Sequence, residues 1–379
     1  MRGQADDQVP LFHVFSVEER IRSDHPLRDI KRRVDRILTT MSSQLDAAYS
    51  HTGRPSVPPE RLLKALLLMA LYSVRSERQL CERIDTDLLF RWFLDLQPSD
   101  PAFDATTFSH NRQRLHEHGL TKTFFTWVVH EALAAGLCSE HFSVDGTLIE
   151  SFAAAKSFQP KSSADEPKDT QGFQPRNLEV DFHGQKRTNE THQSRTDPEA
   201  RLYRKGPGKE AKLAHLGHAL GENRHGLVLA VTVTEANGTA ERAAALALLQ
   251  ECQATHSVQP RTLGADKGYD DGQFFRDVEA RHIELHVPLV KPPKDLEGET
   301  HIPRREGIEA RQRMQAREQT DGYRLSQKCR KKIEEVFGWL KDVAGLDRSR
   351  VVGRWKLQQL FELGAAAYNL VRLRKLKPA

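Results

Sequence analysis

The chain has few cysteines, no long apolar run and no secretory leader pattern. Its four cysteines are far apart and form no Cys-x-x-Cys pair; they are Cys81, Cys138, Cys252 and Cys329. This spacing argues against a zinc site and favours a reducing compartment. The longest apolar run, residues 62–72, is interrupted by Lys64 and is too short to cross a bilayer. No positive–apolar–small pattern occurs at the N-terminus, so we expect neither secretion nor a membrane partner.

The charge of the chain is small in total but uneven along its length. The 379 residues, 38% hydrophobic and 29% charged, are enough for two or three globular domains. Residues 323–379 hold fourteen Lys or Arg against five Asp or Glu, which leaves residues 1–322 mildly acidic within a total of +5. A basic C-terminal segment on such a chain favours binding to polyanions. A solubilising tail is the alternative.

Residues 1–135 are predicted to form an all-helical domain. Capping signals and helical spacing of apolar residues indicate helices at 26–41, 59–73, 76–84, 85–96 and 104–115. Short helices joined by tight turns are typical of a helix-turn-helix DNA-binding unit. In that interpretation the last helix reads DNA with His110, Asn111, Arg112 and Arg114. A purely structural helical bundle is the alternative.

Residues 136–379 alternate between strand-like and helix-like segments. Strands are predicted at 141–148, 212–220, 226–234, 261–266 and 284–289, and helices at 238–255, 271–282, 327–343 and 357–373. This order predicts a mixed sheet flanked by helices, an α/β layer domain. Two polar stretches interrupt it, at 156–204 and 291–323. Both are predicted as surface loops, the first partly disordered.

The helix predicted at 327–343 places three charged residues along one flank. Its apolar residues recur at helical spacing and form a stripe for burial. At about 100° per residue, Arg330, Glu334 and Lys341 fall beside that stripe, whereas Glu335 points away from it. An ordinary amphipathic helix with charge pairs four residues apart is the alternative.

Two aspartates in strand-like runs complete a set of three carboxylates with Glu334. Asp145 lies within a predicted strand, where Asp has poor β-propensity, and Asp266 ends another strand before a glycine turn. Carboxylates without a His or Cys set suit Mg²⁺ or Mn²⁺. Two such ions support phosphodiester displacement. The plain alternatives are a turn aspartate at Asp145 and a loop-closing one at Asp266.

Other polar residues nearby have structural interpretations. Asp270 and Asp271 open a predicted helix, and N-capping explains them. Glu150 is expected in solvent. His215 and His218 are three apart in a strand-like run, hence on opposite faces, and we expect them to be structural.

Three separated motifs resemble those of bacterial insertion-sequence transposases of the Asp-Asp-Glu (DDE) type, in the insertion-sequence-five family. They are Val144-Asp-Gly-Thr147, Leu263-Gly-Ala-Asp-Lys-Gly-Tyr-Asp270 and Arg330-x3-Glu334-x6-Lys341. Further similarity lies at residues 205–209, 337–341, 345–346 and 366–370. The resemblance covers nearly the whole chain, including its helical N-terminal domain. One position departs from the family pattern, because Gln327 stands where the third motif often has a tyrosine, and Tyr323 lies four residues earlier.

The resemblance implies a ribonuclease-H-like catalytic domain in residues 136–379. It implies that Asp145, Asp266 and Glu334 are catalytic and bind two Mg²⁺ ions, or Mn²⁺, and that Arg330 and Lys341 bind DNA phosphates. The implied reaction is hydrolysis at transposon ends, followed by attack of the freed 3′-OH on target DNA without a covalent protein–DNA intermediate.

The implied partners are double-stranded DNA, as inverted repeats and target, and further copies of the chain. The implied location is the bacterial cytoplasm, at the nucleoid. Two alternatives stay open: a catalytically silent DNA-binding regulator, and a nuclease of the same fold that cuts without joining.

Overall fold

The computed structural model describes most of the chain. The described residues are 16–50, 52–53, 56–161, 187–204, 206, 210–297 and 299–376. Much of the predicted polar excursion at 156–204, and most of the 205–209 motif, therefore lie outside them. No helix in the described part of the chain is long and apolar enough to cross a membrane.

The N-terminal region is all-helical, as predicted. Its helices are α1 (Val17–Arg20), α2 (Leu27–Thr40), α3 (Ser42–Ala47), α4 (Pro59–Leu71), α5 (Glu77–Thr86), α6 (Leu88–Phe93), α7 (Ala105–Glu117) and α8 (Leu120–Ala134). The Ser76 hydroxyl accepts from the Gln79 amide at 3.1 Å, as its capping signal predicts. The helix predicted at 85–96 is divided, because Asp87 ends α5 and caps α6.

The second region contains a mixed, six-stranded sheet in the order β4-β5-β1-β7-β8, with β6 also on β5. Its strands are β1 (His141–Glu150), β4 (Arg201–Tyr203), β5 (Lys212–Glu222), β6 (Val228–Glu235), β7 (Thr262–Gly264) and β8 (Glu284–His286). β1 pairs antiparallel with β5 and parallel with β7, and β7 pairs parallel with β8. The predicted hairpin of β5 and β6 is confirmed.

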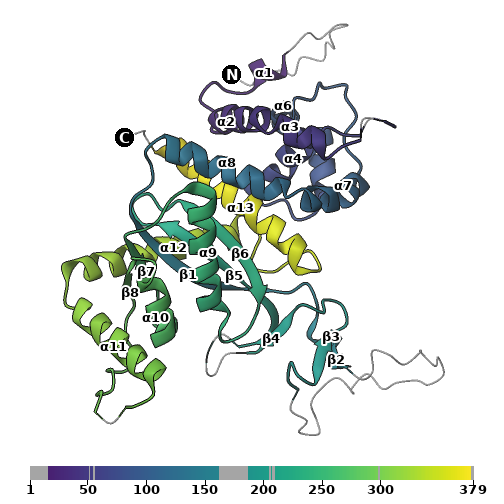
Figure 1. Ribbon diagram of the computed structural model, residues 1–379. Coiled ribbons are helices and arrows are strands. Elements are labelled where there is room, and N and C mark those ends of the chain that lie inside the picture. The colour runs from purple at the N-terminus through teal and green to yellow at the C-terminus, as the bar shows by residue number, and fades with distance from the viewer. Residues whose placement is uncertain are drawn as a thin grey trace, which may run out of the picture.

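Helices cover both faces of this sheet (Figure 1). They are α9 (Ala240–His256), α12 (Asp321–Asp342) and α13 (Arg354–Lys375), with α10 (Gly272–Glu279) beside β8. A Cβ added to Gly146 of β1 would meet Glu241 of α9, whereas one added to Gly217 of β5 would meet Phe361 of α13. Gly217 pairs with Thr147, the residue after Gly146, and a Cβ on Gly221 of β5 would meet Ile333 of α12. Because successive residues of a strand point to opposite faces, α9 lies on one face and α12 and α13 lie on the other. The architecture is that of a ribonuclease-H-like domain after a helical region, as predicted.

Helix α13 joins the two regions into one core. In Figure 1 it lies between the N-terminal helices and the sheet, alongside α8. Thr121 of α8 donates to the Glu362 carboxylate at 2.6 Å, and Asn369 exchanges two hydrogen bonds with the backbone of Val228 in β6. The basic segment that begins at residue 323 is therefore not a tail, because its second helix lies in the interior.

The prediction of a loop at 291–323 is wrong. Residues Ile302–Arg317 form α11, and α12 already begins at Asp321. Only Ala310 and Met314 of α11 are buried, so no apolar stripe signalled a helix. Ion pairs hold it instead: Arg311 binds Asp270 through two nitrogens at 2.8 and 2.9 Å. Arg313 and Arg317 both pair with Glu279 of α10.

The prediction of a loop at 156–204 is wrong for part of its described residues. Phe158–Pro160 (β2) and His192–Ser194 (β3) pair antiparallel as a separate two-stranded sheet. Arg201–Tyr203 forms β4 at the end of β5. Strands this short carry no alternating pattern that a sequence would reveal.

Candidate active site

Asp145 lies in the middle of β1, on the face of the sheet that α12 covers. Its Oδ1 accepts from the Gly146 amide at 2.7 Å, and its Oδ2 lies 3.4 Å from Nη1 of Arg330. Burial raises the pKa of Asp145 to about 6, against the opposing effect of the Gly146 amide, and the negative charge of Asp266 adds to the rise. A buried carboxyl beside a second carboxyl is the arrangement that a bound cation stabilises.

Asp266 stands beside Asp145 because their strands are parallel neighbours. Ser143 of β1 pairs with Gly264 of β7, so the chain positions two residues further along lie next to each other. Asp266 then caps the short turn Lys267–Tyr269, and its Oδ1 accepts from the Gly268 amide at 2.8 Å. The predicted pair of carboxylates is thus brought together on the central strands β1 and β7.

Helix α12 brings Arg330 and Glu334 beside Asp145. Its buried residues include Ile333, Val336, Phe337 and Leu340, which confirms the predicted apolar stripe. Arg330 bridges the two carboxylates, with Nη1 at 3.4 Å from Asp145 and Nη2 at 3.3 Å from Glu334. Glu335 is exposed on the other side of the helix, as its position in the helical turn predicts.

The remaining predicted residues of α12 have different neighbours. Lys341 lies 3.8 Å from Asp347, and no contact between Lys341 and Glu334 occurs in the described structure. Gln327, at the position where the resemblance expects a tyrosine, donates to the carbonyls of His286 and Ala265 at 2.7 and 3.3 Å. Gln327 therefore ties α12 to the ends of β7 and β8, one residue before Asp266.

The three carboxylates do not form a closed cluster. Among the residues that the structure describes, no three His, Cys, Asp or Glu side chains lie close enough together to hold a metal ion. Their predicted convergence within metal-bridging reach is therefore not met. The Arg330 guanidinium stands between Asp145 and Glu334 and contacts each through a different nitrogen. The site thus has the acidic, all-oxygen character that suits a hard divalent ion.

Two residues that the sequence did not single out lie beside the aspartates. Glu241, in the first turn of α9, places one carboxylate oxygen 3.0 Å from where a Cβ on Gly146 would be, and the other 3.5 Å from one on Gly268. Tyr269 is fully buried, and its hydroxyl has no hydrogen-bond partner in the described structure. Burial raises the pKa of Tyr269, and the charges of Glu241, Asp145 and Asp266 add to the rise. Tyr269 lies within the second motif but was given no role there, and no motif or period marked Glu241.

The residues judged structural from the sequence have identifiable partners. Asp271 caps α10 through the Phe274 amide, as predicted, but Asp270 binds Arg311 instead of capping a helix. His215 lies 3.0 Å from the buried Asp197, and His218 lies 2.8 Å from the Thr234 hydroxyl. Glu150 was expected in solvent and instead pairs with Lys212 at 2.9 Å.

The candidate recognition helix α7 turns two of its four predicted DNA-reading residues inward. Asn111 accepts from the Tyr49 hydroxyl at 3.1 Å, and Arg112 pairs with Glu77. Both are buried, so neither reaches a base while this packing persists. His110 is exposed, and the Arg114 guanidinium lies over the Tyr49 ring.

Two protein-family models match the chain. Residues 138–370 match the family model described as Transposase DDE domain, and residues 15–114 match the one described as Transposase domain (DUF772). No curated protein and no solved structure matches the chain. The first match spans more than half of the chain and contains Asp145, Asp266 and Glu334.

Proposed function

The chain belongs to the DDE transposase family, and we propose that it cleaves the ends of a mobile DNA element and joins the freed 3′-OH to target DNA. The observation that carries this proposal is the bridge from Arg330 to Asp145 and Glu334 beside Asp266. It places one acid of β1 and one acid of α12 around a positive charge, with Asp266 following the neighbouring strand β7. Neither alternative, a silent regulator or a nuclease that only cuts, explains this arrangement better.

DDE transposases depend on divalent metal ions, and we propose that Asp145, Asp266 and Glu334 hold two Mg²⁺ ions here, or Mn²⁺. Such ions activate the attacking oxygen and stabilise the leaving one. Asp145 and Asp266 are positioned by neighbouring strands, so their separation is fixed by the sheet. Glu334 is 57% exposed in its side chain, so its rotamer can follow a ligand. Arg330, once the carboxylates hold other cations, donates to a DNA phosphate near the cut.

Lys341 is proposed as a second phosphate contact, about two helical turns beyond Glu334. Its only ion pair in the described structure is a long one, 3.8 Å to the exposed Asp347. Exposed pairs of this kind contribute little stability, so Lys341 exchanges Asp347 for a phosphate at small cost. The proposed partners are accordingly the element's inverted repeats and the target DNA, bound by more than one copy of the chain.

A strand-transfer assay tests the proposal against its alternatives. Labelled duplexes that carry the element ends are incubated with a target plasmid and Mg²⁺, and products are resolved under denaturing conditions. A joined product supports the transposase. Cleavage without joining identifies a nuclease, and binding without cleavage identifies a regulator. Asp266→Asn serves as the catalytic blank, and any joined product formed by that variant contradicts the site.

A further inference from the structure

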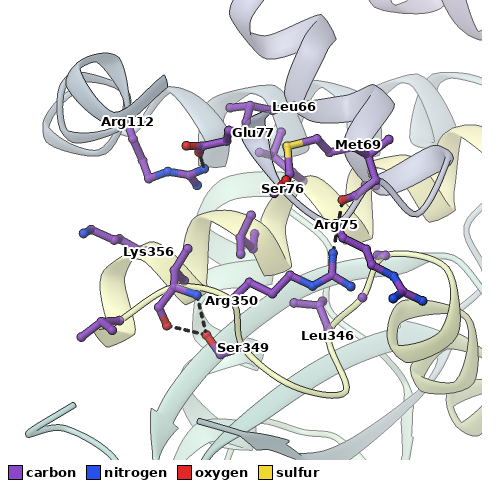
Figure 2. A pocket seen from close by; sticks show the side chains of 18 of the residues that line it. Leu66, Met69, Arg75, Ser76, Glu77, Arg112, Leu346, Ser349, Arg350 and Lys356 are labelled. Atoms are coloured by element: carbon purple, nitrogen blue, oxygen red, sulfur yellow. Dashed lines mark hydrogen bonds and ion pairs between the residues drawn. The ribbon is translucent and has the colours of Figure 1, made fainter. Parts of the chain in front are cut away.

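A cavity of about 440 Å³ lies where the N-terminal helices meet the loop that joins α12 to α13. Figure 2 shows it from close by. Its wall is largely apolar and includes Leu66, Met69, Leu346, Leu360 and Leu363. Two regions far apart in the sequence therefore share one hollow, which neither the family match nor the catalytic site explains.

Four cations line this cavity, and only one acid does. The cations are Arg75, Arg112, Arg350 and Lys356, and the acid is Glu77. Glu77 is already paired with Nη2 of Arg112. Arg112 is only 7% exposed, and its Nη1 is buried without a hydrogen-bond partner in the described structure. An unpaired buried donor on a charged group is costly. A ligand that brings an acceptor to Nη1 of Arg112 would remove this cost.

The other three cations of the cavity, unlike Arg112, have no acidic partner in the described structure. In the described part of the chain, no carboxylate lies within ion-pair distance of Arg75, Arg350 or Lys356. Arg350 donates to the Val74 carbonyl at 3.2 Å, and Figure 2 shows its guanidinium pointing toward Arg75. The pKa of Arg350 is lowered by burial and by the neighbouring charge of Arg75. Like charges held together beside an apolar wall favour a bound anion.

We propose that this cavity binds a backbone phosphate of the DNA substrate, with the adjoining sugar against the apolar wall. The inference rests on the proposed function for its choice of anion. The cavity has room for more than a free phosphate, and pockets of this size take whole small ligands. A strand seated here touches α5 and α7 as well as α13, so it links the helical region to the catalytic domain.

The position along α12 predicts how far this contact lies from the cut. Helix α12 runs eight residues beyond Glu334 to Asp342, and Ala344 of the cavity wall follows two residues later. At 1.5 Å per residue the helical part is about 12 Å long, roughly three to four nucleotides of one strand. A strand seated along α12 would need about that length to reach from the carboxylates to the cavity.

Removal of two of the cations tests the proposal. Arg75 and Lys356 form no ion pair in the described structure, so we expect Arg75→Ala/Lys356→Ala to retain the fold, which circular dichroism checks. The matched control is Arg374→Ala/Lys375→Ala, which removes two exposed charges from the end of α13. Binding of a labelled 30-base-pair duplex is measured in EDTA from low to high salt, so that no cleavage intervenes.

We expect the cavity variant to bind the duplex about tenfold more weakly, with a salt slope smaller by about one to two. The control should change affinity less than threefold. Equal losses in both variants, or none in the cavity variant, would overturn the proposal. In a second arm, thermal unfolding is followed with inorganic phosphate against chloride at equal ionic strength. Phosphate should raise the midpoint of wild type only.

If phosphate raises that midpoint while duplex binding is unchanged in the cavity variant, the occupant is a free phosphate and the DNA assignment is wrong. The strand-transfer assay separates this inference from the proposed function. If the cavity variant binds the duplex more weakly, as expected, but wild type forms no joined product, only the proposed transfer reaction is rejected. If wild type forms joined product but the cavity variant binds the duplex normally, only the cavity proposal is rejected.

Discussion

Helices α12 and α13 have the same length and lie in the same basic segment, yet they have opposite surroundings. Each contains 22 residues, of which five are buried in α12 and thirteen in α13. The charged flank of α12 contacts Asp145 on the central strand β1. Helix α13 instead fills the space between the N-terminal helices and β6. The net charge of a segment therefore does not tell which of its helices contacts DNA.

The difference matters for the hypothesis that residues 323–379 form a DNA-binding tail. Deletion of this segment would remove the apolar face of α13 as well as its charges, so a loss of DNA binding after truncation would be uninformative. Substitutions of single side chains separate the two helices. Substitutions in α12 should change the cleavage rate, whereas substitutions in α13 should change the free energy of unfolding.

The largest expected effect is on catalysis, from Glu334→Gln in α12. Loss of one of three metal-binding carboxylates should lower Mg²⁺-dependent cleavage about a thousandfold, which corresponds to about 4 kcal/mol. The unfolding midpoint should change little because the side chain is exposed. Single-turnover cleavage and a thermal melt on the same preparation measure both quantities.

Glu335→Gln is the matched control, one residue away on the opposite side of α12. Its cleavage rate should stay within twofold of wild type. An equal loss in both variants would show that the assignment of the metal-binding residue on this helix is wrong. Full activity in Glu334→Gln would show that Asp145, Asp266 and Glu334 do not form the metal-binding set.

A smaller effect, on stability, is expected from Asn369→Ala in α13. Asn369 is fully buried, and it accepts from the Val228 amide at 2.9 Å and donates to the Val228 carbonyl at 2.7 Å. The alanine leaves two buried backbone groups unpaired, so the free energy of unfolding should fall by about 3 kcal/mol. Denaturant unfolding measures this. Unchanged stability would mean that water replaces the side chain.

Gln327→Ala tests how firmly α12 is held beside Asp266. The substitution removes the hydrogen bonds to the carbonyls of His286 and Ala265. Glu334 would then be less precisely placed, and we expect cleavage to fall about tenfold, or about 1.4 kcal/mol. Gln327→Glu, which keeps the length but not the donor, should behave alike. Wild-type cleavage rates in both variants would show that the apolar stripe of α12 is enough to position this helix.

The sequence predicted the helical region, the order of the main strands and the face of α12 because each rests on a local period or cap. It also singled out Asp145, Asp266 and Glu334, whose motifs are continuous in sequence, as the predicted metal-binding set. Helix α11 was missed because ion pairs, not an apolar stripe, hold it in place. The inward orientation of Asn111 and Arg112 in α7 was missed because their partners, Tyr49 and Glu77, are far away in the sequence.

Residues that act through tertiary contacts gave no signal at all. Glu241 approaches the aspartates from α9 across the sheet, and the two neighbouring glycines leave room for it. The acceptor role of Asp145 toward Arg330 depends on packing between β1 and α12. Such proximity is set by the topology of the sheet, which no spacing within one segment encodes.

The smallest expected effect is on stability, from Glu362→Gln in α13. Glu334→Gln in α12 should lower the cleavage rate, whereas this change should raise the free energy of unfolding. Burial raises the pKa of Glu362, against hydrogen bonds from the Thr121 hydroxyl and the Gln358 amide. A carboxyl whose pKa is raised in the fold contributes stability below its unfolded value near 4.5. That contribution is lost as the pH rises through the folded pKa.

At neutral pH, Glu362→Gln should therefore increase the free energy of unfolding, by on the order of 1 kcal/mol, because the amide avoids a buried charge. The gain should shrink as the pH falls toward 4.5, where wild type is itself neutral at this position. Cleavage should be unchanged, in contrast to Glu334→Gln. Denaturant unfolding at pH 7 and at pH 4.5 measures the difference. A destabilised variant at both values would mean that the charged carboxylate is the form that Thr121 and Gln358 hold, and α13 would then depend on an ionised acid in its interior.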